Sequence, residues 1–189
     1  MEILAIVTLW LLVFILAGWI YRSWRSLSEL KQAPTLKLSG SISRRGRMSI
    51  LIPAKNEEKN IADCVRPLLA QLRDGDEIIV INNCSTDHTE EILKELGAVE
   101  IPIEASSITS RLKLKYLNTP QTPSGWTGKN YALHLGAPHA SGDWLLFTDA
   151  DTRHGPGSID SAVSFSEDRQ LDLLTLLPRC LAHGFWENL

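Results

Sequence analysis

Cysteine is scarce in this sequence, which contains only three: Cys64, Cys84 and Cys180. None of them belongs to a Cys-x-x-Cys pair, so a disulfide scaffold and a cysteine zinc site are excluded, and reduced thiols in a cytoplasmic domain are expected. Internal repeats and low-complexity tracts are also absent. The net charge of −3 shows no basic excess of the kind that phosphate-backbone binding requires. We therefore expect no nucleic-acid partner.

One long apolar run is present, at the amino terminus, where residues 3–20 are nearly all apolar. A helix of that length extends roughly 27 Å, which is enough to cross the core of a bilayer. A cleaved signal peptide is the alternative, but Met1-Glu2 supplies no basic region ahead of the run. The sequence therefore predicts an uncleaved transmembrane anchor over residues 1–21.

The segment after the anchor, residues 22–47, is strongly basic and contains a single acid, Glu29. Lysine and arginine accumulate on the cytoplasmic side of membrane anchors. We therefore expect a cell-membrane protein with one N-terminal span, a basic juxtamembrane linker at 22–47 and a cytoplasmic domain at 48–189. The chain ends at Leu189 in an apolar and aromatic stretch, so we expect this domain to be incomplete at its carboxyl terminus.

Apolar runs and helical patterns alternate after residue 47, which predicts an α/β domain with a mostly parallel sheet. Residues 104–128 contain several prolines and glycines and are predicted to form a long loop. The strand at 144–148 has no turn residue and is expected to be buried on both faces. The expected strands are 48–52, 77–81, 99–103, 144–148 and 171–177, and the expected helices are 61–72, 89–96, 129–140 and 159–166.

Two carboxylates, Asp149 and Asp151, directly follow the expected strand at 144–148. Open α/β sheets bind their ligands at the carboxyl ends of strands. Where the strand bends into a loop, both side chains can converge on one ion. Hard divalent cations such as Mg²⁺ and Mn²⁺ prefer oxygen ligands and commonly bridge to phosphates. The alternative is that Asp149 caps a turn and Asp151 is solvated, and an isolated Asp-x-Asp leaves both interpretations open.

Four motifs occur in order along the chain, and together they resemble the nucleotide-binding half of an inverting family 2 glycosyltransferase. Those enzymes have the GT-A fold, which is Rossmann-like, and the resemblance covers about residues 48–189. The run 125–133 and the anchor are most similar to membrane-attached members that glycosylate lipids, including hopanoid- and carotenoid-associated enzymes. The motifs are Pro53-Ala54-Lys55-Asn56-Glu57, Asn83-Cys84-Ser85-Thr86-Asp87, Gly128-Lys129 and Asp149-Ala150-Asp151.

The resemblance implies transfer of a sugar from a nucleoside diphosphate sugar, expected to be UDP-linked, to a membrane-associated and possibly lipid acceptor. It implies that the first motif lies along the nucleoside, that Lys129 lies near the diphosphate, and that a bound Mn²⁺ or Mg²⁺ bridges the diphosphate. Asn82 and Asn83 stand where an aspartate commonly accepts the uracil N–H, which leaves base specificity open. The implied nucleotide-sugar-binding residues are Pro53, Ala54, Asn56, Glu57, Asn83, Asp87, Lys129 and Asp149, and the implied metal ligands are Asp149 and Asp151.

Individual residues in these motifs also have simpler interpretations. Asp87 can cap the helix that follows it, and Glu57 can favour a helix dipole. Trp126 can face a sugar or a lipid, but burial under its loop is the expected arrangement. The run 149–152 also matches the Asp-x-Asp-x-Thr signature of haloacid-dehalogenase-type phosphatases, although that signature follows the first strand of its domain.

The catalytic base of an inverting transfer is the one element for which this sequence offers no convincing candidate. In the family it is an acid well downstream of the double-Asp loop. We therefore expect the base to lie beyond the end of this chain. A fragment of a longer enzyme, or a catalytically incomplete membrane-anchored protein that binds sugar nucleotides, are the alternatives to an active enzyme.

Overall fold

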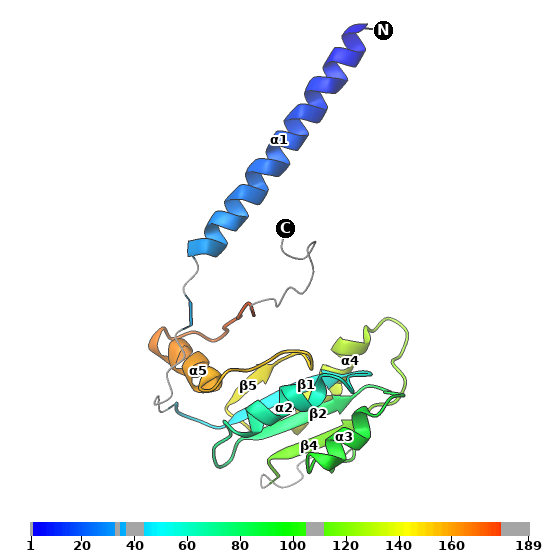
Figure 1. The fold of residues 1–189 in the computed structure, drawn as a ribbon, viewed down its shortest axis with the longest axis vertical. Helices are drawn as coiled ribbons and strands as arrows, with labels where there is room; N and C mark the ends of the chain where they lie inside the picture. The colour runs from blue at the N-terminus through cyan, green and yellow to red at the C-terminus, as the bar shows by residue number, and fades with distance from the viewer. Residues whose placement is uncertain (1, 33–34, 37–43, 105–111, 179–189) are drawn as a thin grey trace. The chain divides into compact units, whose positions relative to one another are not determined.

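The computed structural model describes residues 2–32, 35–36, 44–104 and 112–178 (Figure 1). The chain forms two compact units, Met1–Lys37 and Leu38–Leu189. Helix α1 (Glu2–Gln32) lies in the first unit, and its segment Ile6–Ser26, with mean hydropathy 1.8, is long and apolar enough to cross a membrane. The helix continues past the predicted anchor because residues 22–32 are mostly good helix formers.

The second unit is built on a parallel sheet with the strand order β3-β4-β2-β1-β5 in the part of the chain that the structure describes. This arrangement confirms the predicted α/β class with a mostly parallel sheet. Its strands are β1 (Met48–Ala54), β2 (Glu77–Asn82), β3 (Val99–Glu100), β4 (Leu114–Asn118) and β5 (Trp144–Phe147), and its helices are α2 (Ile61–Leu69), α3 (Thr89–Glu95), α4 (Gly128–Gly136), the 3₁₀ turn η1 (Ala137–His139) and α5 (Ser158–Asp168).

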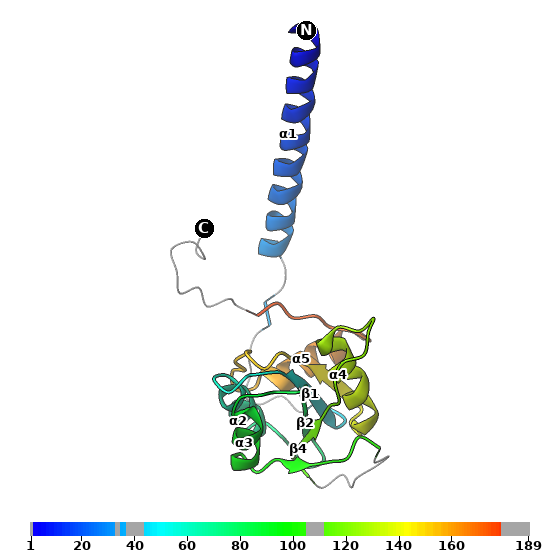
Figure 2. The same ribbon diagram turned by 90° about the vertical axis from the view of Figure 1, so that its right-hand side faces the viewer.

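Helices cover both faces of this sheet, as the alternating side chains of its strands require. On one face Ile50, Ile52 and Val80 pack against α2, α3 and α5. On the other face Leu51, Ile79 and Ile81 pack against α4. Figure 2 shows α2 and α3 on one side of the sheet and α4 on the other. The carboxyl ends of the strands therefore lie between two layers of helices.

Two predictions about strands were wrong. Strand β4 lies inside the predicted loop 104–128, of which residues 105–111 fall outside the described part. Lys115 hid this strand in the sequence, because a lysine in its centre is buried only by pairing with Glu77. Conversely, residues 171–177 form no strand, and Leu173 is 82% exposed. The apolar run of these residues predicted a strand but did not indicate which neighbouring strand would pair with it.

Strand β5 differs from its prediction in burial. Leu145 and Phe147 are 46% and 52% exposed, so the strand is not buried on both faces. The physical reason is its place in the sheet, since β5 forms an edge of the described sheet and α4 contacts β1 and β2. A central and an edge strand can carry the same apolar sequence.

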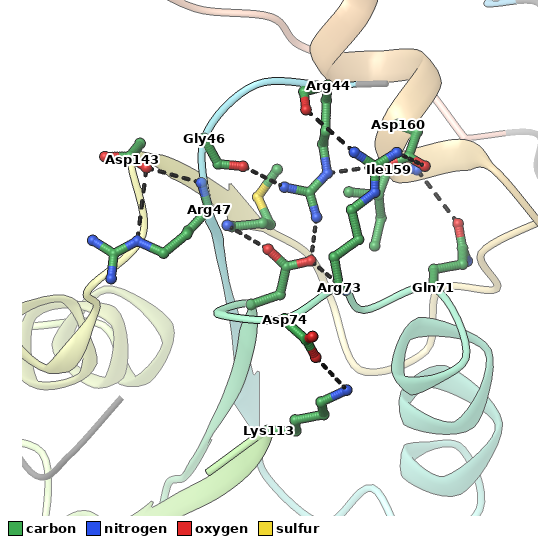
Figure 3. Close-up of polar contacts among 12 residues, drawn as sticks. Arg44, Gly46, Arg47, Gln71, Arg73, Asp74, Lys113, Asp143, Ile159 and Asp160 are labelled. Carbon is green, nitrogen blue, oxygen red and sulfur yellow. Dashed lines mark hydrogen bonds and ion pairs between the residues drawn. The ribbon is translucent and has the colours of Figure 1, made fainter. Parts of the chain in front are cut away.

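A buried polar cluster holds the segment before β1 at the amino ends of the strands (Figure 3). The Arg44 guanidinium pairs with Asp76, donates to Asp160 Oδ1 at 2.9 Å and donates to the Gly46 carbonyl at 2.9 Å. Arg73 Nη2 reaches the second oxygen of Asp160 at 2.7 Å. Because Asp160 belongs to α5, the cluster connects that helix to the amino ends of β1 and β2, away from the strands' carboxyl ends.

Candidate functional site

A pocket of about 440 Å³ opens at the carboxyl ends of β1, β2 and β5 and at the amino terminus of α4. This is the edge of a parallel sheet where open α/β domains bind ligands. Three loops and one helix start converge there, and their polar groups include two carboxylates of one loop and two lysines. The lining residues are Pro53, Ala54, Lys55, Glu57, Asn83, Gly128, Lys129, Ala132, Asp149, Ala150 and Asp151.

The loop after β1 is fixed to the loop after β2 by reciprocal hydrogen bonds. Asn56 has a positive φ of 56° and accepts from the Thr86 N–H at 2.8 Å, while its own N–H donates to Ser85 Oγ at 2.9 Å. Glu57 N–H donates to Thr89 Oγ1 at 2.8 Å. Asn56 is therefore engaged between the two loops, whereas the neighbouring Glu57 lines the pocket.

Asp87 is also engaged between these loops. Its carboxylate accepts from the backbone N–H groups of Glu58 and Thr89, both at 3.0 Å. Desolvation raises the pKa of Asp87, but the hydrogen bonds from Thr89 and Glu58 outweigh it and hold the pKa below its usual value. Asp87 thus satisfies the N–H of Thr89, the first residue of α3, although the N-cap residue of that helix is His88. Asp87 is not among the residues that line the pocket in this structure.

The two asparagines after β2 have different surroundings. Asn82 is buried, donates to Asn118 Oδ1 at 2.7 Å, and has no partner for its own Oδ1 among the described residues. Asn83 lines the pocket and accepts from Thr119 Oγ1 at 2.9 Å. A Cβ at Gly128 would lie 2.6 Å from Asn83 Nδ2, so this glycine permits the close approach of α4 to the β2 loop.

The double-Asp loop, which follows β5 and contains Asp149 and Asp151, is bound to α2 by two contacts. Burial raises the pKa of the Cys64 thiol to about 12, so it remains protonated and donates to the Asp149 carbonyl at 3.5 Å. Asp63, beside it on α2, pairs with Arg153 at 2.8 Å. The loop is thereby attached to the helix on both sides of Asp151.

A hydrogen bond within the loop closes it at its base. Thr148 Oγ1 and His154 Nε2 lie 2.9 Å apart, and burial lowers the pKa of His154 below its usual value. The Thr152 N–H also donates to the Asp149 carbonyl at 3.1 Å, which forms a tight turn. These contacts leave the Asp149 and Asp151 side chains exposed to the pocket. The Asp149 carboxylate pairs with the Lys129 ammonium across the pocket.

The donor set fits a hard divalent cation that is shared with a substrate. In the described part of the chain, no three His, Cys, Asp or Glu side chains gather as a closed metal cage. Mg²⁺ typically takes one or two carboxylates and completes its shell with water and phosphate oxygens. Asp149 and Asp151 supply carboxylates of this kind beside an open pocket.

The pocket brings together most of the residues expected from the sequence: Pro53, Ala54, Glu57, Asn83, Lys129, Asp149 and Asp151 line it. Their ligand roles stay predictions. Sequence reasoning missed the pocket contact of Ala132, whose only signal is a small residue on the sheet-facing side of α4. It also placed Trp126 under its loop, whereas the indole is 45% exposed and packs against Tyr131 and His134.

Comparison with known proteins gives three further findings. The sequence model described as "Glycosyl transferase family 2" matches residues 49–178. The chain is 31% identical over 144 residues to a 4,4'-diaponeurosporenoate glycosyltransferase of Staphylococcus haemolyticus, and 31% identical over 143 residues to the Staphylococcus aureus protein of the same name. Each match covers 75% of this chain and 34% of the relative, so the chain spans about a third of their length.

Among solved structures, the chain resembles mannosyltransferase PcManGT from Pyrobaculum calidifontis, which was determined in complex with GDP-Man and Mn²⁺. The TM-score is 0.52 at 21% identity, and the match covers 78% of this chain and 39% of that one. This likeness supports the fold.

Proposed function

Because this chain belongs to glycosyl transferase family 2, we propose that it forms the donor-binding part of an enzyme that transfers a sugar from a nucleoside diphosphate sugar. The acceptor in this proposal is a membrane-associated lipid. The observation that carries the proposal is the pocket itself, in which a lysine and two aspartates from separate elements face one cavity at the carboxyl edge of the sheet.

The chemistry of the pocket suits a sugar nucleotide. Pro53 and Ala54 at the end of β1 line it, and Glu57 offers a carboxylate that can accept hydrogen bonds from ribose hydroxyls. Lys129 offers a point positive charge of the kind that suits a diphosphate. Mn²⁺ or Mg²⁺ held by Asp149 and Asp151 would neutralise the charge that develops on the departing nucleoside diphosphate.

The membrane part of the proposal rests on α1 and on the relatives. Its segment Ile6–Ser26 can span a bilayer by length and composition, and basic residues follow it, which favours a cytoplasmic domain. The relatives named for 4,4'-diaponeurosporenoate support an acceptor like those of the carotenoid-associated enzymes. The phosphatase alternative has no such support, because the double-Asp loop follows β5 and not the first strand.

Calorimetry on the full chain in detergent tests donor binding. UDP should bind more tightly with Mn²⁺ than without it, and Asp149→Asn or Asp151→Asn should each weaken the metal-dependent binding by about 1.5–3 kcal/mol, the scale of a lost charged contact. Asp143→Asn is the matched control, because Asp143 is exposed beside Arg47 at the opposite end of β5. Equal binding by all four proteins would refute the assigned site, and preference for ADP or GDP would change the assigned base.

The acceptor and the membrane location need separate tests. Sustained, metal-dependent release of UDP from UDP-sugars in the presence of membrane lipids, abolished by Asp151→Asn, would support transfer and would contradict the expectation that the catalytic base lies beyond this chain. Deleting residues 2–21 should move the protein from the membrane to the soluble fraction. A carboxyl-terminal reporter that is active only outside the cell would contradict the cytoplasmic orientation.

A further inference from the structure

An ion pair crosses the candidate pocket and joins two elements that the sequence separates by twenty positions. The Lys129 ammonium on the first turn of α4 pairs with Asp149 Oδ1 in the loop after β5. Both side chains are more than half exposed, at 56% and 54%. The pair therefore occupies one of the two carboxylates that the proposed function assigns to the metal.

The position of Lys129 is unfavourable without an anionic partner. A cation in the first turn of a helix faces the positive end of the helix dipole, where negative charge is preferred. No acidic residue lies in the first turn of α4 itself. Asp149 is therefore the partner that compensates this charge, and a bound diphosphate would be a second partner of the same sign.

An exposed ion pair of this kind is weak and easily exchanged, because solvent screens it and both side chains lose freedom in forming it. It can hold the Asp149 carboxylate in the absence of ligand without locking it. A divalent cation that approaches alone must compete with the ammonium for the same oxygen. A cation that arrives with a diphosphate brings a new acceptor for Lys129 and frees Asp149.

We propose that Lys129 is a resident counter-cation of Asp149 that competes with the divalent metal until a nucleoside diphosphate draws it away. This inference rests on the proposed function and extends it to the order of binding. Metal and nucleotide bind cooperatively, and because linkage is reciprocal, UDP tightens Mn²⁺ by the same factor by which Mn²⁺ tightens UDP. Metal without nucleotide binds weakly because the site already contains a positive charge.

The decisive measurement is Mn²⁺ binding to the full chain in detergent without nucleotide. The electron paramagnetic resonance signal of free Mn²⁺ reports how much of the ion remains unbound. Lys129→Met should bind Mn²⁺ about twofold to fivefold more tightly than the wild type, the range expected for a screened ion pair. Lys55→Met is the matched control, because Lys55 is an exposed lysine of the same pocket and its removal deletes the same charge without releasing Asp149.

A double-mutant cycle assigns the effect to the pair itself. In the Asp149→Asn background, Lys129→Met should no longer tighten Mn²⁺ binding. With UDP present, the order should reverse, and Lys129→Met should bind the Mn²⁺–UDP pair more weakly than the wild type.

Three outcomes would overturn the inference. Unchanged or weaker Mn²⁺ binding in Lys129→Met would do so, and so would an equal gain in Lys55→Met, since general electrostatics would then explain both. In either case metal-dependent UDP binding by the wild type would leave the proposed function intact. Absence of Mn²⁺ binding in every protein, with and without UDP, would overturn the proposed function and the inference together.

Discussion

Replacing Asp76 with alanine should destabilise the domain more than any surface change nearby, because this carboxylate has several partners in the buried cluster at the amino ends of the strands. It pairs with Arg44 and accepts from the Met48 N–H at 2.9 Å and the Arg73 N–H at 2.7 Å. The side chains of Arg44 and Asp76 are 0% and 1% exposed. Asp76→Ala would therefore leave a buried guanidinium and a buried N–H without their main acceptor.

Breaking a buried ion pair by removing one partner costs about 3–5 kcal/mol. The structure favours the lower end, because Arg44 would keep its contacts to Asp160 and to the Gly46 carbonyl, both at 2.9 Å. We expect a loss of about 3 kcal/mol, which corresponds to roughly a hundredfold faster exchange for amides that open only by global unfolding.

Hydrogen exchange detected by mass spectrometry suits this measurement, because peptides from β1 and β2 report on the domain alone, whereas three of the six tryptophans belong to α1. Asp74→Ala is the matched control, since Asp74 lies on the same turn, is fully exposed and is 3.7 Å from Lys113. It should change stability by less than about 0.5 kcal/mol. Equal exchange rates in the two variants would refute the assigned role of the cluster. In a double-mutant cycle with Arg44→Met, the two losses should be less than additive, because both substitutions remove the same Arg44–Asp76 pair.

Three further changes test other parts of the structure. Desolvation raises the pKa of Glu77, but hydrogen bonds from a buried lysine and two serines lower it below its usual value. The wild type should therefore be more stable than Glu77→Gln above about pH 4.3, and this difference should disappear as the pH falls through the folded-state pKa of Glu77. Gly142→Ala would place a Cβ 2.5 Å from the Ser49 nitrogen, and faster hydrogen exchange should report a loss of about 1–3 kcal/mol. His154→Ala should weaken Mn²⁺–UDP binding in calorimetry without unfolding the domain, because it frees the double-Asp loop at its base.

Much of the fold could be predicted because its signals are local. The apolar runs of β1 and β2 are continuous and buried on both faces, and the turn at Asp74-Gly75-Asp76 separates α2 from β2. Strand β4 could not be predicted in this way. Its central Lys115 is buried only because Glu77, on the neighbouring strand, compensates its charge, and no window of sequence around Lys115 contains that partner. Burial of a charged residue depends on a tertiary contact, whereas burial of an apolar residue is already indicated by its own side chain.

Tertiary contacts that the local sequence does not contain also explain which features of the site could be described only from the structure. Motif order placed the polar residues at one edge of the sheet, because parallel strands end there, and the pocket collects most of them. The sequence could not decide between a ligand and a scaffold role for Asp87, because a carboxylate before a helix serves either purpose. The structure shows the scaffold contacts, in which Asp87 accepts from the Glu58 and Thr89 N–H groups and thereby fixes the loops around the pocket; its ligand role stays a prediction. A residue of that kind controls affinity through loop position, so its loss should lower stability and UDP affinity together, whereas loss of Lys129 should lower UDP affinity without lowering stability.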